Sequence, residues 1–276
     1  MTGIEATVQA HYGGNDRLTR IEAALRAAGK DPLKLTVQDL EPYDHLHGRG
    51  IVATRELAER AAVRPGMRVL DLGCGIGGAS RYLTATCGCI VTGLDLTPEY
   101  IDAARVLTER CGLGGRIAFH QGSALALPFA DASFDRVWCH NVTMNIPDKA
   151  KLASEAARVL ARGGRFVCAE VELGPAGSPI YPLPWANDLS SSFLVTPAEM
   201  RAALEGAGLR ILEQLDLTAA VLAFRHEMQA RAARGEPPLV MNEVIMGDDF
   251  LTRARNSQKS AGEGRLVEQI IVAEKI

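Results

Sequence analysis

The sequence lacks several features that would assign it to other classes of protein. It contains no run of about 20 apolar residues, the length that a membrane helix needs, and its first residues contain no apolar core of a signal peptide. Basic residues are not in excess, because 30 Lys and Arg stand against 33 Asp and Glu. These absences argue against a membrane protein and against nucleic acid as a partner, and we expect a cytoplasmic location.

Cysteine is sparse and is not grouped as it is in zinc sites. The six cysteines are scattered through apolar stretches, which suits buried, reduced thiols. Cys87 and Cys89 are separated by one glycine, but no second pair follows at zinc spacing. Internal repeats and low-complexity tracts are also missing. The chain therefore predicts one main domain with helical insertions.

What the sequence does contain, from Met67 onward, is an alternation of short apolar segments with helical patterns. Strands are predicted over residues 69–71, 90–94, 117–119, 134–139, 165–171, 209–217 and 266–273. Gly163 and Gly164 predict a turn before the fifth of these strands. This alternation is typical of a parallel sheet that is covered on both faces. In such sheets the ligand lies beyond the carboxyl ends of the strands.

Residues 1–64 predict a helical cover, and residues 65–276 predict the sheet domain on which it lies. Asp16 precedes a helical apolar pattern that Gly29 ends, and Thr36 with Asp39 begins a second helix. Residues 51–63 form a third, amphipathic pattern. Two insertions interrupt the sheet domain. One is proline-rich, at about 173–195, and the other, at 219–262, predicts a long helix, a loop and a shorter helix.

The stretch from Met67 to Gly78 organises this domain. A strand runs into a turn in which Gly73, Cys74 and Gly75 bring bare backbone close to a ligand. Such a glycine loop also fits dinucleotide-binding proteins. Asp71 favours a different ligand, because a carboxylate is unfavourable beside a pyrophosphate and favourable beside a cation.

Four stretches in this order resemble the class I S-adenosylmethionine-dependent methyltransferases. They are closest to the small-molecule branch, which includes quinone-biosynthesis and sarcosine/dimethylglycine enzymes. The stretches are VLDLGCGIGG, VTGLDLTPEYI, GSALALPFADASFD and RVLARGGRF. The resemblance implies a Rossmann-like, doubly wound α/β fold with a mostly parallel seven-stranded sheet whose last strand is antiparallel. It also implies methyl transfer from S-adenosylmethionine to a small-molecule acceptor, with S-adenosylhomocysteine as the second product.

The resemblance and the residue chemistry together predict the donor site. Asp71 serves the donor's ammonium, through water or by orienting the glycine loop. Asp95 accepts hydrogen bonds from both ribose hydroxyls, and Leu96 packs on the adenine. After the third strand the family usually has an acid for the adenine amino group. This chain has Ser123 there, whose hydroxyl accepts that bond without charge assistance, beside the backbone of Ala124.

His140 and Asn141 follow the fourth strand, where donor and acceptor are expected to meet. Methyl transfer is an in-line displacement, so the enzyme contributes alignment and, for some acceptors, removal of a proton. The ordinary pKa of histidine suits His140 to act as the base. The alternative is that His140 hydrogen-bonds the cofactor or the backbone. Asn141 is a candidate for contact with the acceptor.

A polar segment before the sheet domain carries Tyr43, His45, His47 and Arg49. By resemblance this segment closes over the cofactor, with His47 on the cofactor side and Arg49 beside the methionine carboxylate. Tyr43 and His45 are candidates for catalysis and for acceptor binding. His45 and His47 alternate, as the first two ligands of some metal sites do, but no third ligand is evident. We predict no metal.

The remaining candidates lie at and after the end of the fifth strand. Glu170 faces either the acceptor or solvent. Tyr181, Trp185 and Phe193 either form the wall of an acceptor pocket or pack within their proline-rich loop. The helices over 219–262 form an acceptor lid, a contact in a homodimer or plain core.

Three other functions remain open at this point. A nicotinamide-dependent oxidoreductase is disfavoured by Asp71 and by the lack of a Tyr-x-x-x-Lys pair or a metal dyad. A non-catalytic module that binds S-adenosylmethionine is suggested only by Ser123. A methyltransferase of macromolecules is disfavoured for nucleic acid by the modest net charge of -3, which leaves protein substrates open.

Overall fold

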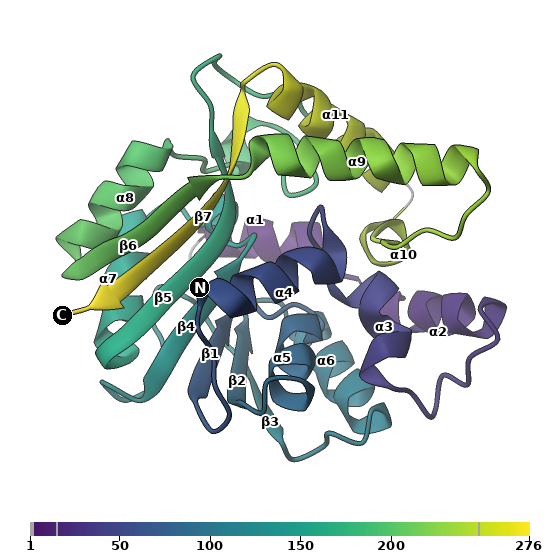
Figure 1. Ribbon diagram of the computed structural model, residues 1–276, viewed down its shortest axis with the longest axis horizontal. Coiled ribbons are helices and arrows are strands. Elements are labelled where there is room, and N and C mark those ends of the chain that lie inside the picture. Colours follow the sequence, from purple (N-terminus) through teal and green to yellow (C-terminus); the bar gives the residue numbers. More distant parts are fainter. Residues whose placement is uncertain (1–2, 15, 248) are drawn as a thin grey trace.

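A seven-stranded sheet with helices on both faces forms the centre of the protein (Figure 1). The structure is a computed structural model, and it describes residues 3–14, 16–247 and 249–276. The strands are β1 (Arg68–Leu72), β2 (Ile90–Asp95), β3 (Ile117–Gln121), β4 (Phe134–His140), β5 (Leu160–Leu173), β6 (Leu209–Asp216) and β7 (Leu266–Lys275). Their order is β3-β2-β1-β4-β5-β7-β6, and β7 is antiparallel to both of its neighbours. The fold class predicted from the sequence is confirmed.

The two faces of the sheet bury different sets of helices. On one face, α7 (Lys149–Val159) and α8 (Pro197–Gly206) pack against strand residues that include Leu70, Val137 and Phe166. On the other face, α4 (Gly50–Arg60), α5 (Gly78–Ala85) and α6 (Pro98–Arg110) cover a set that includes Val69 and Trp138. Alternate residues of one strand point to opposite faces, so near-continuous apolar strands are buried on both sides.

The strand order reverses direction at β1. The chain crosses from β1 outward to β2 and β3, and then returns to β4 on the other side of β1. Loops that leave the carboxyl ends of β1 and β4 therefore diverge, and a crevice opens between them. This reversal decides where a ligand is bound.

Two N-terminal helices, α2 (Arg17–Ala27) and α3 (Val37–Asp44), share a core with the sheet domain. Ile21 and Leu25 of α2 pack in one cluster with Leu107 of α6 and with Ile245 of α10 (Glu243–Met246). The predicted helix start at Thr36 and Asp39 is confirmed, and the two residues form a capping box. The Asp39 backbone amide donates to Thr36 Oγ1 at 3.2 Å, and the Thr36 amide donates to Asp39 Oδ2 at 2.9 Å. The predicted boundary between residues 64 and 65 stays a prediction.

Three features differ from the sequence-based expectations. An additional helix, α1 (Gly3–Tyr12), precedes α2. The glycine pair at residues 163–164 does not turn the chain before a strand. The pair lies inside the continuous strand β5, where the register against β4 shifts by three residues. On either side of this shift, Leu160 pairs with Phe134 and Arg165 pairs with Arg136. The insertion over 219–262 holds three helices, namely α9 (Thr218–Ala233), α10 (Glu243–Met246) and α11 (Phe250–Gly262).

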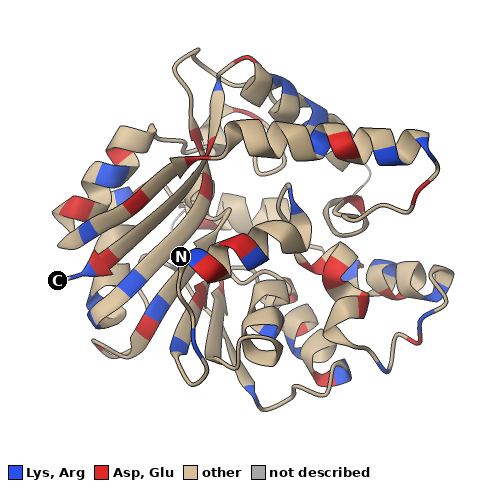
Figure 2. Ribbon diagram, in the orientation of Figure 1, with Lys and Arg blue, Asp and Glu red and all other residues tan. Residues whose placement is uncertain are grey.

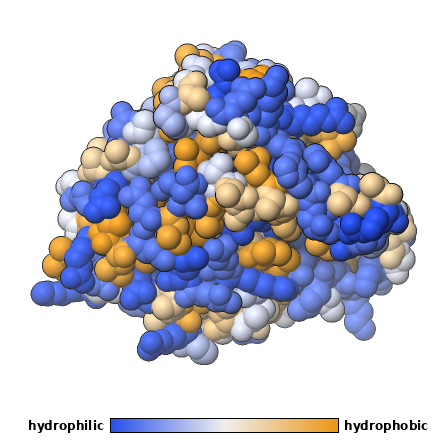
Figure 3. Space-filling view, turned by 45° about the horizontal axis from the view of Figure 1, so that its top comes forward, coloured by the Kyte–Doolittle hydropathy of each residue, from blue (hydrophilic) through white to orange (hydrophobic). Residues whose placement is uncertain are grey.

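The surface carries both signs of charge. Lys and Arg are interspersed with Asp and Glu along the helices and strands of Figure 2. Apolar side chains on the face shown in Figure 3 form patches that hydrophilic side chains separate. Within the described part of the chain, no helix has the length and apolar character needed to cross a membrane.

Two short 3-10 helices, η1 (Thr143–Asn145) and η2 (Leu189–Ser191), complete the secondary structure of the described residues.

Candidate functional site

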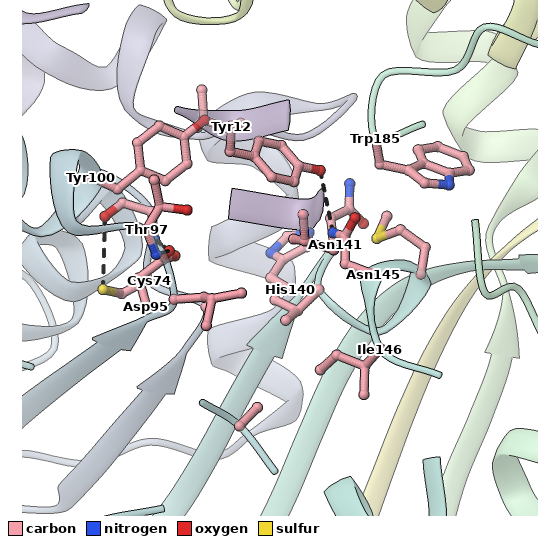
Figure 4. A pocket seen from close by; sticks show the side chains of 18 of the residues that line it. Tyr12, Cys74, Asp95, Thr97, Tyr100, His140, Asn141, Asn145, Ile146 and Trp185 are labelled. Carbon is pink, nitrogen blue, oxygen red and sulfur yellow. Dashed lines mark hydrogen bonds between the residues drawn. The ribbon is translucent and has the colours of Figure 1, made fainter. Parts of the chain in front are cut away.

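A cavity of about 450 Å³ opens beyond the carboxyl ends of β1, β2 and β4. The loops after these strands form its floor, and α1, residues 44–47 and the helices α10 and α11 contribute its walls. Figure 4 shows Asp95, Thr97 and Tyr100 toward one end, His140 in the middle and Trp185 toward the other end. We call the region of Asp71, Asp95 and Ser123 the donor end, and the region of Met144, Ile146 and Trp185 the acceptor end.

The glycine loop presents backbone without side chains to the donor end. Gly73 adopts a φ of +72°, and a Cβ atom there would lie 2.4 Å from Val142 Cγ2. The amides of Gly73 and Cys74 both donate to the Leu94 carbonyl, at 2.7 and 3.0 Å. The amide of Gly75 donates to Asp95 Oδ2 at 2.9 Å. These three N–H groups are therefore committed within the protein, whereas a loop that binds pyrophosphate directs its N–H groups at the ligand.

Asp95, at the end of β2, is buried and held in place by backbone amides. Its Oδ2 accepts from Gly75, and its Oδ1 accepts from the Thr97 amide at 2.9 Å. Burial raises the pKa of the carboxyl group, and these hydrogen bonds oppose that rise. A carboxylate offers about four acceptor positions, so Asp95 keeps capacity for a vicinal diol.

Asp71 lies below the glycine loop and is also buried. Ser80 Oγ donates to Asp71 Oδ2 at 2.6 Å. Burial raises the pKa of Asp71 to about 6, and the nearby charge of Asp95 adds to that effect. No ion pair of Asp71 or Asp95 is found within the described residues, in contrast to Asp44, which pairs with buried Arg81 at 2.6 Å. The donor end therefore attracts positive charge.

Three histidines meet at the middle of the cavity. The rings of His47 and His140 stack with centroids 3.7 Å apart, and Thr54 Oγ1 lies 2.9 Å from His45 Nδ1 and 3.2 Å from His47 Nε2. Burial lowers the pKa of His45 and of His140 to about 3 and holds that of His47 well below its usual value. All three rings are neutral at physiological pH. In the described part of the chain, no group of three His, Cys, Asp or Glu side chains is placed to hold a metal ion.

Helix α1 forms a wall of the cavity that the sequence analysis missed. Ile4, Glu5, Val8 and Tyr12 line it. Tyr12 Oη accepts from Asn145 Nδ2 at 3.2 Å, and Ser123 Oγ donates to Glu5 Oε1 at 2.5 Å. Ile4, Val8 and Tyr12 recur at every fourth position, and this helical period is the signal that identifies the wall from sequence.

The acceptor end is largely apolar. Its lining includes Met144, Ile146, Trp185 and Phe250, which come from widely separated parts of the chain, whereas Met246 Sδ lies 3.8 Å from the Tyr100 hydroxyl, toward the donor end. Trp185 is held by a hydrogen bond from its Nε1 to Ser192 Oγ at 3.0 Å. Among the described residues, no Lys or Arg lines the cavity.

The structure brings thirteen of the predicted site residues to this cavity and places five elsewhere. The lining includes His45, His47, Asp71, Gly73, Cys74, Gly75, Asp95, Leu96, Ser123, Ala124, His140, Asn141 and Trp185. The residues found outside the lining are Tyr43, Arg49, Glu170, Tyr181 and Phe193. Lining a cavity assigns no role, so the individual roles stay predictions.

Four of the five residues outside the lining are engaged by local packing or bonding. Tyr43 is 3% exposed and packs in the apolar cluster of α2, α3 and α6. Arg49 forms an ion pair with Glu56 at 2.7 Å and does not reach the donor end. Tyr181 packs beside the buried cluster under its own loop, and the Phe193 backbone amide bonds to the Met144 carbonyl at 2.8 Å.

Glu170 is an anchor for the loop after β4. Its carboxylate accepts from the Val142 and Thr143 amides, both at 3.0 Å, and from Thr143 Oγ1 at 2.9 Å. Burial raises its pKa to about 7 against these hydrogen bonds. Glu170 therefore fixes Val142, which contacts the glycine loop, and it reaches neither solvent nor the acceptor end.

Sequence comparisons identify the central part of the chain. Residues 70–168 match the family described as methyltransferase domain. The methyltransferase GfsG of Streptomyces halstedii is 36% identical over 133 residues, which cover 48% of each chain. The tocopherol O-methyltransferase of Arabidopsis thaliana is 41% identical over 100 residues, covering 36% of this chain and 29% of that protein. The chain thus spans about half or less of the length of the curated relatives that it matches.

Solved structures share the fold over a longer stretch. Geranyl diphosphate C-methyltransferase from Streptomyces coelicolor A3(2) superposes with a TM-score of 0.72 at 19% identity, over 100% of this chain and 99% of that one. The [4+2]-cyclase SpnF superposes with a TM-score of 0.65 at 21% identity, over 94% of each chain. The predicted resemblance is confirmed: the chain shares the fold of these solved structures, and its residues 70–168 match the methyltransferase domain family.

Proposed function

We propose that this protein binds S-adenosylmethionine and transfers its methyl group to an uncharged, largely apolar small molecule. The observation that carries the proposal is one continuous cavity with two different ends. Two buried carboxylates lie at the donor end. Apolar side chains line most of the rest, with three neutral histidines and the polar side chains of Asn141, Asn145 and Asp148 among them. A cationic donor and a neutral acceptor match these two environments.

The donor end complements S-adenosylmethionine in charge and shape. This donor carries a sulfonium, an ammonium and a carboxylate, so its net charge is positive, and Asp71 supplies negative charge beneath the glycine loop. Asp95 has acceptor capacity for the ribose diol. The committed amides of the glycine loop disfavour a pyrophosphate, and with it the nicotinamide alternative.

The transfer step places the acceptor atom in line with the bond from sulfur to methyl carbon. The acceptor's lone pair or π electrons form the new bond to carbon, and the broken bond leaves its electron pair on sulfur as S-adenosylhomocysteine. The positive charge passes to the acceptor, which then loses a proton if it carried one. His140 is neutral and lies between the two ends, so it is placed to accept that proton.

The acceptor class follows from the lack of positive charge at the acceptor end. Cations near the cavity are engaged within the protein: Arg81 pairs with Asp44, Arg253 pairs with Asp249, and Lys149 donates to the carbonyls of Thr143, Ile146 and Phe193. A phosphate or carboxylate placed among Met144, Ile146 and Trp185 would lose its hydration without gaining a counter-charge. An anionic acceptor is therefore disfavoured in this cavity, even though a diphosphate is named for one structural neighbour.

Radiolabelled methyl transfer tests the proposal. The purified chain is incubated with methyl-labelled S-adenosylmethionine and pairs of acceptors that differ only in charge, such as a phenol or prenyl alcohol and its phosphate ester. We expect label in the uncharged members of the pairs. Transfer to the phosphorylated members alone would overturn the acceptor class. In a parallel melting assay, stabilisation by NADH without stabilisation by S-adenosylhomocysteine would overturn the donor.

A second candidate is binding of S-adenosylmethionine without methyl transfer. It is favoured by the pKa of about 3 for His140, which makes this ring a weak base. The fold itself also occurs in a protein named as a cyclase. Tight donor binding with no transfer to any amine, phenol, thiol, carboxylate or alkene would support this candidate.

Two finer expectations accompany the proposal. One is a cytoplasmic location, with which the six free cysteines are compatible. A homodimer through the helices of 219–262 is the other, although Met246 and Phe250 of this region line the cavity instead. Light scattering on the purified chain measures its molar mass in solution, and a monomeric mass would contradict the homodimer.

A further inference from the structure

The hydroxyl of Ser123 is already engaged and does not suffice to recognise the adenine of S-adenosylmethionine. Its hydroxyl accepts from the Leu125 amide at 3.1 Å and donates to Glu5 Oε1 at 2.5 Å. A hydroxyl has one proton, and here that proton is used on Glu5. The arrangement orients the carboxylate of Glu5, which reaches this point from α1, a helix 118 positions away in sequence.

We infer that Glu5 supplies the carboxylate that accepts a hydrogen bond from the amino group of the donor's adenine. This inference rests on the proposed function, because it concerns the nucleoside end of the same ligand. It assigns a role in recognising adenine to a residue on the N-terminal helix, whereas the other donor-end groups lie at the carboxyl ends of strands or in the loops that follow them.

The position of the base follows from the position of the ribose. With the diol held by Asp95 at the end of β2, the base extends toward β3, the next strand outward. The lining there consists of Leu96 and Thr97 after β2 and of residues 122–125 after β3. Glu5 lines the cavity at this point, in contact with Ser123.

The chemistry favours Glu5 over Ser123 as the acceptor. The exocyclic amino group of adenine is a donor, and hydrogen bonds to a carboxylate are roughly twice as strong as those between neutral groups. A carboxylate also accepts several bonds, so the bond from Ser123 is compatible with a second one from the base. Ser123 is then a positioning residue, and Glu5 is the group that contacts the ligand.

The same helix also reaches the acceptor end. Tyr12 bonds to Asn145 after β4, and His11 Nε2 lies 3.0 Å from the Pro184 carbonyl in the loop that carries Trp185. None of the described residues of α1 is fully buried, so these polar contacts add to the apolar packing of Tyr12 in holding the helix. A base bound to Glu5 would add a further contact and strengthen the wall of the acceptor end before the acceptor binds.

Two ligands that differ only at the base test the inference. Calorimetry gives the dissociation constants of S-adenosylhomocysteine and of S-inosylhomocysteine, in which an oxo group replaces the amino group. The native protein is expected to bind the adenine ligand at least tenfold more tightly, since a carboxylate repels the oxo group. Glu5→Gln is expected to weaken the adenine ligand about tenfold and to remove most of this preference, because the amide donates to the oxo group.

Two control variants separate the outcomes. Thr7→Ala lies on the exposed side of the same helix and should keep the native preference. Asp95→Asn should weaken both ligands equally. A Glu5→Gln protein that keeps the native preference overturns the inference and leaves the proposed function intact. A native protein that binds neither ligand overturns both.

Discussion

The two ends of the cavity are built in different ways. At the donor end, polar groups are fixed by short hydrogen bonds to neighbouring backbone, as Asp95 is to the amides of Gly75 and Thr97. At the acceptor end, apolar side chains such as Met144, Trp185 and Phe250 come together from the loop after β4, the proline-rich loop and α11. The donor end is charged, and the acceptor end is neutral.

This difference separates what is shared with relatives from what is particular to this chain. The family match covers residues 70–168 and therefore includes the donor end. Trp185 and Phe250 of the acceptor end lie outside it, as do the residues of α1 that line the cavity. The donor can be inferred from relatives, whereas the acceptor must be inferred from the cavity itself.

Gly73→Ala should have the largest effect, because Gly73 contacts Val142 where the two ends meet. A Cβ atom there would lie 2.4 Å from Val142 Cγ2, at a φ of +72°. We expect a loss of roughly 3 kcal/mol or more in unfolding free energy, from left-handed strain and overpacking together. Urea denaturation measures it. The matched control is Gly112→Ala, with a φ of +69° and open space around it. Equal losses of unfolding free energy in the two variants would show that the contact with Val142 adds no cost at Gly73.

Asp95→Asn should weaken donor binding about 100-fold and leave the preference for uncharged acceptors unchanged. Hydrogen bonds to a charged group contribute about 1.5–3 kcal/mol each, and the ribose diol makes two. Titration calorimetry with S-adenosylhomocysteine measures the change. Asp102→Asn removes an exposed carboxylate of α6 and serves as the charge control. A loss below threefold at Asp95 would show that the ribose binds elsewhere.

His140→Gln should lower kcat by about 100-fold with little change in the KM of the donor, as expected when a proton acceptor is removed. Because the pKa of His140 is about 3, the native rate should show no histidine ionisation between about pH 6 and pH 8. The matched control is His120→Gln, at an exposed position of β3. A kcat within twofold of the native value would exclude His140 as the base.

The smallest predicted effect is a pH dependence of donor binding. The pKa of Asp71 is about 6, above its ordinary value, so its negative charge is present above pH 6 and is lost as the pH falls through that value. S-adenosylmethionine is a cation and S-adenosylhomocysteine lacks the sulfonium charge. The affinity ratio of the two ligands should therefore shift against S-adenosylmethionine by up to about tenfold between pH 7 and pH 5. Asp71→Asn should abolish the shift, and an unchanged ratio in the native protein would contradict it.

The fold and the residues at the donor end could be predicted from the sequence. Their signals are local: an apolar strand, a turn of glycines and an acid at a strand end are contiguous, as in Asp71–Gly75 and Asp95–Leu96. The carboxyl ends of parallel strands must lie on one edge of the sheet, so their order alone brings these residues together. The capping box at Thr36 was equally predictable, since its two partners are only three residues apart.

Which polar and aromatic side chains reach the cavity could not be predicted, because it depends on packing between distant parts of the chain. Tyr43 and His45 are two residues apart, yet Tyr43 packs in the core and His45 lines the cavity, because packing selects the direction of each side chain. Glu170 proved to be an anchor for a loop, since burial turned its carboxylate toward the amides of Val142 and Thr143. Glu5 reached Ser123 from the far end of the chain, a distance in sequence over which no local pattern carries information.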